Sequence, residues 1–306
     1  MRIFITGATG FIGSAIVREL IGAGYQVLGL TRSEAGAKSL AAAGAEVHRG
    51  DLADLESLRR GAAGADGVIH TAFNHDFSRY VANCEDDRRV IEALGSALAG
   101  TGRPLLISSG TAMANSAPGR LATEKDAAAS SAAVPRAASE EAAALAAAQG
   151  VRVSVVRLPQ VHNTFKQGLI SYAIAVAREK GVSAYVGEGL NRWPAAHVLD
   201  TARLYRLALE KREADARYHA VAEEGVPLRD IAEVIGRGLK VPVISVSPEK
   251  AAGHFGWLGA FAGRDAPASS AQTQEQLGWH PTGPGLIADL EQMEYFEPSG
   301  VASAAR

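Results

Sequence analysis

The chain has 306 residues, enough for one large α/β domain or for a domain with a smaller lobe. Its 31 Lys and Arg residues nearly balance 33 Asp and Glu residues and form no basic run, which argues against nucleic acid or an anionic membrane as a partner. The lone cysteine, Cys84, excludes an internal disulfide, and no stretch approaches the roughly 20 apolar residues of a membrane span, so we expect a cytoplasmic protein without a signal peptide.

The first thirty residues have the pattern of a strand, a glycine-rich turn, a helix and a second strand. A short apolar run reaches the turn TGATGFIG at residues 6–13, and a second apolar run ends at Leu30. Gly7 allows a sharp turn, Gly10 leaves room for a pyrophosphate, and Gly13 lets the helix pack closely on the sheet. The helix N-terminus would then bind the phosphates. This stretch therefore predicts a dinucleotide-binding unit rather than a glycine turn without a ligand.

The residues after the second strand indicate which dinucleotide binds. An acidic residue there would bind the ribose hydroxyls of NAD, whereas an arginine accommodates the 2′-phosphate of NADP. The chain has Arg32 and Ser33 at this point and no carboxylate before Glu34. Arg32 can donate paired hydrogen bonds to a phosphate, and Ser33 can add another. We therefore favour NADP(H) over NAD(H) as the cofactor; the alternative is a solvated surface arginine.

Further strand patterns follow along the chain, separated by helical patterns. They lie at 45–49, 67–72, 104–107, 150–157 and 217–222. Such alternation is typical of an α/β protein in which helices connect parallel strands. The sequence therefore predicts a Rossmann-type doubly wound parallel sheet.

The segment 73–80, with the sequence FNHDFSRY, leaves the fourth strand and is both polar and aromatic. Ligands of open α/β sheets bind at the carboxyl ends of the strands. His75, Asp76 and Tyr80 are therefore candidate substrate contacts, and a surface loop with satisfied side chains is the alternative. Apolar residues at helical spacing over 81–99 then predict a long helix.

The spacing G-x-x-G-x-x-G of the first turn resembles the opening of extended and atypical short-chain dehydrogenase/reductases. This group includes sugar-nucleotide epimerases and 3β-hydroxysteroid dehydrogenases. The resemblance continues with Asp-Leu at 51–52, Arg-Leu-Pro at 157–159, His-Val-Leu-Asp at 197–200 and the closing segment 277–281. It implies that the chain binds NAD or NADP on its sheet and covers its substrate with a small C-terminal lobe.

The resemblance also implies how the chain divides. We expect an NADP-binding Rossmann core to which a later segment returns, a substrate-binding lobe made of two segments, and a flexible tail. The ranges are 1–165 for the core, 195–222 for the returning segment, 166–194 and 223–298 for the lobe, and 299–306 for the tail. Phe255, Trp257 and Phe261 in the lobe hint at a pocket for apolar or aromatic groups, although core packing explains them equally well.

The motif and the resemblance together imply a cofactor site along one edge of the sheet. It comprises the glycine turn, the end of the second strand, the Asp-Leu step near the adenine, the end of the fourth strand and the residues that flank the nicotinamide. These residues are Gly7, Thr9, Gly10, Phe11, Ile12, Gly13, Arg32, Ser33, Asp51, Leu52, Thr71, Ala72, Phe73, Ser108, Leu158 and Pro159. A helix N-cap role for Asp51 or Asp54 is an equally open alternative.

In this family a serine after the fifth strand binds the substrate carbonyl, and Ser109 and Thr111 are the hydroxyls best placed for that role. The family's proton donor is the tyrosine of a Tyr-x-x-x-Lys pair, whose lysine lowers the tyrosine's pKa. None of the seven tyrosines of this chain has a lysine four residues later. Matching Ser139-Glu140 to the family's Ser-Lys puts Arg136 at the tyrosine position and Glu140 at the lysine position, and arginine releases no proton at neutral pH. The chain therefore resembles an atypical member of the group.

These expectations combine into an NADP-dependent oxidoreductase that transfers a hydride between the nicotinamide and a small carbonyl or alcohol substrate. The proton donor would be His75, Tyr80, His162 or water; for His162 a structural turn residue is the alternative. Two other functions stay open: an NADP(H)-binding sensor or regulatory protein that has lost catalysis, and a sugar-nucleotide epimerase or dehydratase. We expect no metal, a small-molecule substrate, and neither nucleic acid nor a membrane as partner; a regulator would act through a protein partner, and a homodimer is suggested by analogy alone.

Overall fold

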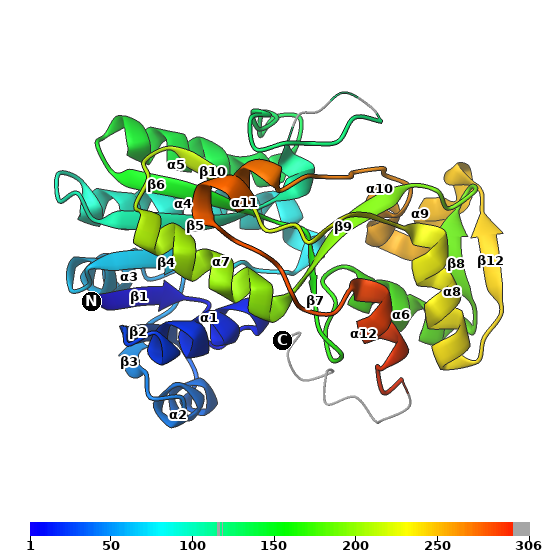
Figure 1. Ribbon diagram of the computed structural model, residues 1–306, viewed down its shortest axis with the longest axis horizontal. Helices are drawn as coiled ribbons and strands as arrows, with labels where there is room; N and C mark the ends of the chain where they lie inside the picture. Colours follow the sequence, from blue (N-terminus) through cyan, green and yellow to red (C-terminus); the bar gives the residue numbers. More distant parts are fainter. Residues whose placement is uncertain (115–116, 118, 296–306) are drawn as a thin grey trace.

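The computed structural model describes residues 1–114, 117 and 119–295, and its larger part is built on one sheet (Figure 1). The strands of this sheet are β1 (Arg2–Thr6), β2 (Gln26–Thr31), β3 (Glu46–Arg49), β4 (Gly67–His70), β5 (Pro104–Gly110), β6 (Arg152–Leu158) and β10 (Ala216–His219). Their order is β10-β6-β5-β4-β1-β2-β3, and every neighbouring pair is parallel. The predicted Rossmann-type doubly wound sheet is confirmed, and its order reverses between β1 and β4, where such sheets bind ligands.

Helices cover both faces of this sheet, because its strands are apolar on both sides. One face carries α1 (Phe11–Gly22), α2 (Glu34–Ala42), α7 (Val198–Lys211) and α11 (Ala271–Leu277). The other carries α3 (Leu55–Ala63), α4 (Tyr80–Leu98) and α5 (Ala138–Ala148). Successive side chains of a strand point to opposite faces, so Ile3 and Ile5 of β1 pack in the first layer and Phe4 in the second.

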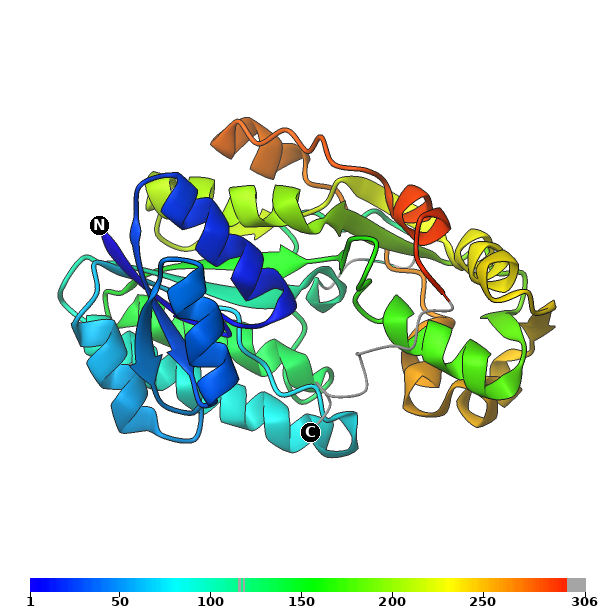
Figure 2. The ribbon, with the colours of Figure 1, turned by 90° about the horizontal axis from the view of Figure 1, so that it is seen from below.

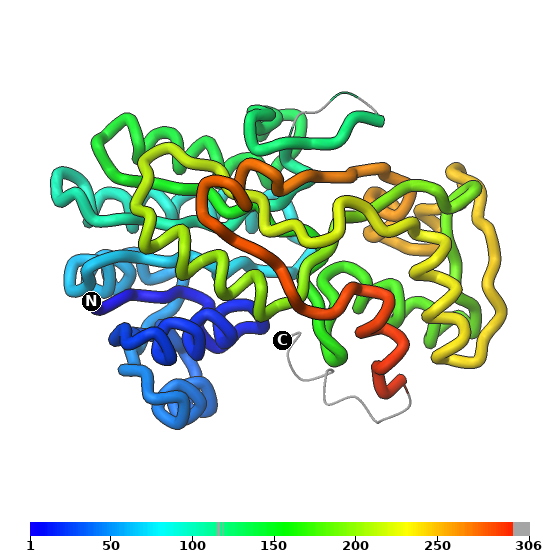
Figure 3. Tube along the Cα trace, in the orientation of Figure 1, coloured from blue at the N-terminus to red at the C-terminus, as the bar shows by residue number. Residues whose placement is uncertain are grey.

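The remaining elements form a smaller second part, on the right of Figures 1 and 3 and again in the view from below in Figure 2. Its strands are β7 (Gln160–His162), β9 (Arg192–His197) and β11 (Glu223–Pro227) in one sheet, and β8 (Ser183–Val186) and β12 (Val243–Val246) in another. Its helices are α6 (Ile170–Lys180), α8 (Leu228–Leu239), α9 (Ala251–Phe255), α10 (Gly259–Ala262) and α12 (Leu286–Glu291). A separate apolar cluster, including Ile174, Trp193, Ile231 and Leu286, forms its core. Residues of α7 and β10 pack instead with the large sheet, and the domain boundaries given above remain predictions.

Short 3-10 helices join several of these elements. They are η1 (Phe77–Arg79), η2 (Thr111–Met113), η3 (Pro135–Ala137), η4 (Pro248–Lys250) and η5 (Gly256–Leu258). The helix predicted over 81–99 is confirmed as α4. The strand predicted at 217–222 is shorter, because the chain turns after β10 toward the other sheet, where Ala222 donates to the carbonyl of Ala195. The tail predicted at 299–306 lies outside the described residues, and within them no helix has the length and apolar character to cross a membrane.

Candidate active site at the carboxyl edge of the sheet

The glycine turn after β1 fits the pyrophosphate of a dinucleotide. Gly7 has a φ of +69°, and a Cβ there would lie 2.7 Å from the backbone nitrogen of Ala72. A Cβ on Gly13 would come within 2.0 Å of the carbonyl oxygen of Gly7, so glycine is required for this approach of α1 to the turn. No side chain caps α1 at Gly10, which is exposed together with Thr9. The first amides of α1 can therefore bind an anion.

Arg32 and Ser33 end β2 and begin α2 at the same edge of the sheet. The side chain of Arg32 is 70% exposed, and its ion pair with Asp51 spans 3.5 Å. The Ser33 hydroxyl oxygen caps α2 by accepting a backbone hydrogen bond, which leaves the hydroxyl proton able to donate elsewhere. Asp54, and not Asp51, caps α3. Asp51 therefore caps no helix and lies beside Arg32. Both Asp51 and Leu52 are half-buried.

A chain of buried polar contacts links the glycine turn to Arg136. Thr6, the last residue of β1, shares a 2.6 Å hydrogen bond with Nδ1 of His70. Nε2 of His70 lies 2.9 Å from one carboxylate oxygen of Asp87 on α4, and the other oxygen accepts from Arg136 over 2.9 Å. Burial alone would raise the pKa of Asp87, but Arg136, His70 and a hydrogen bond from Ser139 lower it to about 2. Asp87 is therefore ionised at neutral pH and holds the guanidinium in place.

Arg136, in η3, lies between the ends of β4 and β5. Its guanidinium carbon is 4.3 Å from the centre of the Phe73 ring, and its Nη2 donates to the carbonyl of Ser108 over 3.0 Å. Thr71 and Ala72, which precede Phe73, are half-buried beside the glycine turn. A guanidinium at this point can polarise a bound oxygen but cannot release a proton.

Glu140 and Arg157 form a second buried ion pair. Nε and Nη2 of Arg157 donate to the two oxygens of Glu140 over 2.9 and 2.8 Å, and their side chains are 0% and 6% exposed, respectively. Ser109 donates its hydroxyl proton to Glu140 over 2.7 Å. The Thr111 hydroxyl makes only a 3.5 Å contact with the carbonyl of Leu158. Thr111 is therefore freer than Ser109 to donate to a substrate oxygen.

The loop after β4 and the first residue of α4 supply two of the proton-donor candidates, His75 and Tyr80. Burial raises the pKa of Tyr80 to about 12, against the opposing charges of Arg136 and Arg264, so the phenol is protonated at neutral pH. Desolvation by the neighbouring protein lowers the pKa of His75, and the positive charges of Lys166 and Arg136 lower it further. The residue still keeps contact with solvent. His75 is therefore neutral at pH 7, where Tyr80 retains a proton to donate.

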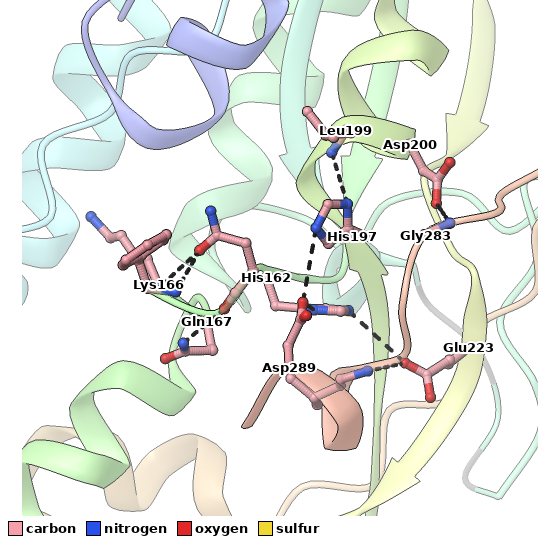
Figure 4. A network of polar contacts seen from close by, with 12 residues as sticks. His162, Lys166, Gln167, His197, Leu199, Asp200, Glu223, Gly283 and Asp289 are labelled. Atoms are coloured by element: carbon pink, nitrogen blue, oxygen red, sulfur yellow. Dashed lines mark hydrogen bonds and ion pairs between the residues drawn. The ribbon is translucent and has the colours of Figure 1, made fainter. Parts of the chain in front are cut away.

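His162, the third candidate, lies where the two parts of the molecule meet (Figure 4). Its ring is buried, and Nδ1 is 2.6 Å from Asp289 of α12. Nε2 has no hydrogen-bond partner among the described residues; it lies 4.0 Å from Glu223 of β11, and the ring of His197 is 5.9 Å away. Burial lowers the pKa of His162 against the opposite effect of Asp289. These contacts join β7, β9, β11 and α12, and none of them reaches the end of β5.

Sequence reasoning missed Asp87 and Asp289, the carboxylates that hold Arg136 and His162. These partners lie 49 and 127 residues apart in the sequence. A signal did exist, because both carboxylates fall on the apolar stripe of their helices. A carboxylate on a buried stripe needs a charged or hydrogen-bonding partner, although the sequence does not name it.

The fold and the glycine turn at its switch point define the class of Rossmann-fold proteins that bind NAD or NADP. Within this class the chain belongs to the NAD dependent epimerase/dehydratase family, whose family model matches residues 3–222. The family resemblance drawn from the sequence is thereby confirmed.

Similar proteins agree with this assignment. The chain is 52% identical over 297 residues, 97% of its own length and 100% of the relative's, to "Uncharacterized protein C2A9.02" of Schizosaccharomyces pombe. It is 26% identical to a UDP-glucose 4-epimerase of Streptomyces lividans, with 98% of each chain covered. The structure of DesIV, a dTDP-glucose 4,6-dehydratase from Streptomyces venezuelae with NAD and TYD bound, has a TM-score of 0.76 at 21% identity and covers 95% of this chain and 96% of that chain. This structural likeness shows the fold alone.

Proposed function

We propose that the protein is an NADP-dependent oxidoreductase that acts on a small carbonyl or alcohol substrate. The observation that carries this proposal is the convergence of three features at the carboxyl edge of the sheet. The uncapped start of α1, the exposed Arg32 after β2 and the hydroxyl of Thr111 after β5 all follow parallel strands, so they share that edge. Bound NADP(H) would supply or accept the hydride.

The cofactor site of this proposal keeps the predicted residues. The glycine turn and the first amides of α1 bind the pyrophosphate, and Arg32 with the free proton of Ser33 binds the 2′-phosphate. The adenine would contact Asp51 and Leu52. The nicotinamide end would contact Thr71, Ala72, Phe73, Ser108, Leu158 and Pro159. Residues 1–165 and 195–222 would thus bind the cofactor, and 166–194 and 223–298 the substrate.

We assign the catalytic groups according to which side chains have a proton available for the substrate. Thr111 donates to the substrate oxygen, because Ser109 gives its proton to Glu140. We assign the role of proton donor to Tyr80, because its phenol is protonated at neutral pH. Arg136 stabilises the negative charge that develops on the oxygen. A protonated phenol favours reduction of a carbonyl, with His75, His162 or water as the other donors to be tested.

The test is a titration with NADPH and NADH, followed by NADPH consumption with aldehydes, ketones and imines. We expect tighter binding of NADPH and turnover with at least one of these classes. Tight NADPH binding without turnover would favour the alternative of a sensor, which is supported by the buried ion pairs of Arg136 and Glu140. Interconversion of UDP-sugars in place of net NADPH consumption would favour an epimerase.

A further inference from the structure

An aromatic wall spans the two parts of the molecule beside the candidate site. Phe77, in the loop after β4, stacks on Trp257 of η5 with 3.8 Å between ring centres and 8° between planes. Tyr172 of α6 meets both rings edge-on, at 5.8 and 5.0 Å, and Tyr80 stacks on Phe77 at 5.7 Å. Tyr172 and Trp257 are each 37% exposed. The wall therefore presents aromatic surface to whatever enters the site.

Three cations approach the same loop. Arg136 lies over Phe73, whose ring is 5.3 Å from that of His75. Arg264, which follows α10, donates to the carbonyl of Ala112 over 3.0 Å and so lies against η2, next to Thr111. Lys166 lies between β7 and α6, and Figure 4 shows its side chain extending away from the His162 cluster. Its charge contributes to the lowered pKa of His75.

Two of these charges have no carboxylate partner among the described residues. Asp87 neutralises Arg136, but the side-chain contact of Arg264 is with a carbonyl. The ammonium group of Lys166 has neither a hydrogen bond nor an ion pair in the described part of the chain, and it is exposed. Asp76, the carboxylate of the loop, accepts its hydrogen bonds from Ser78. The site therefore carries unbalanced positive charge beside an aromatic wall, which suits an anion with a flat apolar body.

Building on the proposed oxidoreductase function, we infer that the substrate is a 2-oxo acid with an aromatic or apolar body. The aromatic wall holds the body, Lys166 and Arg264 bind the carboxylate, and Thr111 binds the oxygen of the ketone. In the reduction the carbonyl carbon gains a hydride from NADPH and its oxygen gains one proton. The products are a 2-hydroxy acid and NADP⁺, so atoms and electrons balance.

The experiment measures binding without turnover, by calorimetry with the full chain and NADP⁺. Benzoylformate is the acidic probe and methyl benzoylformate its neutral match. We expect the acid to bind about tenfold more tightly than the ester. Lys166→Gln and Arg264→Gln should each weaken the acid about fivefold and leave the ester unchanged. Lys250→Gln, an exposed lysine in η4, is the matched control and should change neither.

The place of binding can be read independently from tryptophan fluorescence. Trp193 and Trp279 are buried, at 4% and 0% exposure, so Trp257 is the tryptophan that a ligand can reach. Benzoylformate should quench its emission. Trp257→Leu should weaken acid and ester alike in calorimetry, because it removes the shared aromatic contact and leaves the charges.

The outcomes separate this inference from the oxidoreductase proposal. Selective binding of the acid without reduction of any carbonyl would keep the anion site and overturn the reductase. Equal binding of acid and ester, or no binding of the acid below about 1 mM, would overturn the 2-oxo acid assignment, whatever the panel shows. Tighter binding of UDP-glucose that is lost in the same two variants would assign the cations to a diphosphate and overturn it as well.

Discussion

The two halves of the candidate site differ in how the chain builds them. The glycine turn takes its shape from residues 6–13 and the adjoining end of β4, and its closest approaches are to backbone atoms. The surroundings of Arg136 are held instead by buried charges from distant parts of the chain: Asp87 lies 49 residues from Arg136. The buried ion pair between Glu140 and Arg157 likewise joins two elements, α5 and β6, across 17 residues of sequence. Backbone shape therefore determines the structure of the glycine turn, and charge pairing determines the structure around Arg136.

This difference indicates how each half can be broken. A turn that excludes a Cβ loses its shape when any side chain is added, and with it the cofactor. A buried ion pair loses much more stability when one partner is removed or reversed, because the other charge stays in a low dielectric without compensation. Substitutions in the charged half should therefore cost more folding free energy than substitutions in the turn.

The largest effect is expected from Arg136→Tyr combined with Glu140→Lys, which writes the family's Tyr-x-x-x-Lys pair into η3 and α5. The new lysine would face Arg157, whose side chain is fully buried. We expect the free energy of unfolding to fall by about 5 kcal/mol, without a gain in NADPH-dependent turnover. Urea unfolding and the carbonyl panel measure these two results.

Glu92→Lys is the matched control for that charge reversal, because Glu92 is an exposed residue of α4. It should leave the free energy of unfolding within about 0.5 kcal/mol of the wild type. A stable double variant with strong new activity would contradict the prediction, and would mean that the site was merely disabled.

The next largest effect is expected from Asp87→Asn, which keeps the shape of the side chain and removes its charge. Arg136 would lose its buried counter-ion, so the free energy of unfolding should fall by about 3 kcal/mol. Asp86→Asn, at the neighbouring exposed position, is the control and should have little effect.

The pH dependence of stability gives this prediction a second measurement. The pKa of Asp87 is about 2 in the folded protein, below its ordinary value of 3.8. A lowered pKa means that the stabilisation is fully present above a pH of about 4 and is lost as the pH falls through about 2. Asp87→Asn should remove about 2 kcal/mol of this acid-dependent change. Identical pH profiles for wild type and variant would show that Asp87 is not the ionised partner of Arg136.

A smaller loss of stability, but a complete loss of cofactor binding, is expected from Gly13→Ala. The added Cβ would come within 2.0 Å of the Gly7 carbonyl, so α1 must move away from the turn. We expect about 2 kcal/mol of destabilisation and no measurable NADPH binding by fluorescence titration. Gly22→Ala, at the open end of the same helix, is the control and should keep both properties. Unchanged NADPH affinity in Gly13→Ala would separate the turn from the cofactor site.

Predictability from sequence follows the same division. The succession of strands along the chain, the glycine turn and the place of Arg32 after the second strand could be predicted, because alternating patterns and turn glycines act within a few residues. The pairing of Asp87 with Arg136, and of His162 with Asp289, could not be predicted, because any buried carboxylate needs a partner but only the packed fold decides which one. The donation from Ser109 to Glu140 belongs to this second kind. It favours Thr111 over Ser109 as the donor after β5, a choice that the sequence left open.

The smallest effect is expected at the end of β2, where Arg32→Asp tests the choice of cofactor. The side chain is mostly exposed and its contact with Asp51 is long, so folding should be unaffected. The variant should bind NADPH about tenfold more weakly and NADH no less tightly, because an aspartate repels the 2′-phosphate and can accept hydrogen bonds from the ribose hydroxyls. Arg18→Asp, on the outer face of α1, makes the same charge change away from β2 and should shift neither affinity. If the ratio of the two affinities is the same in wild type and Arg32→Asp, the arginine does not contact the cofactor and the preference for NADP has lost its basis.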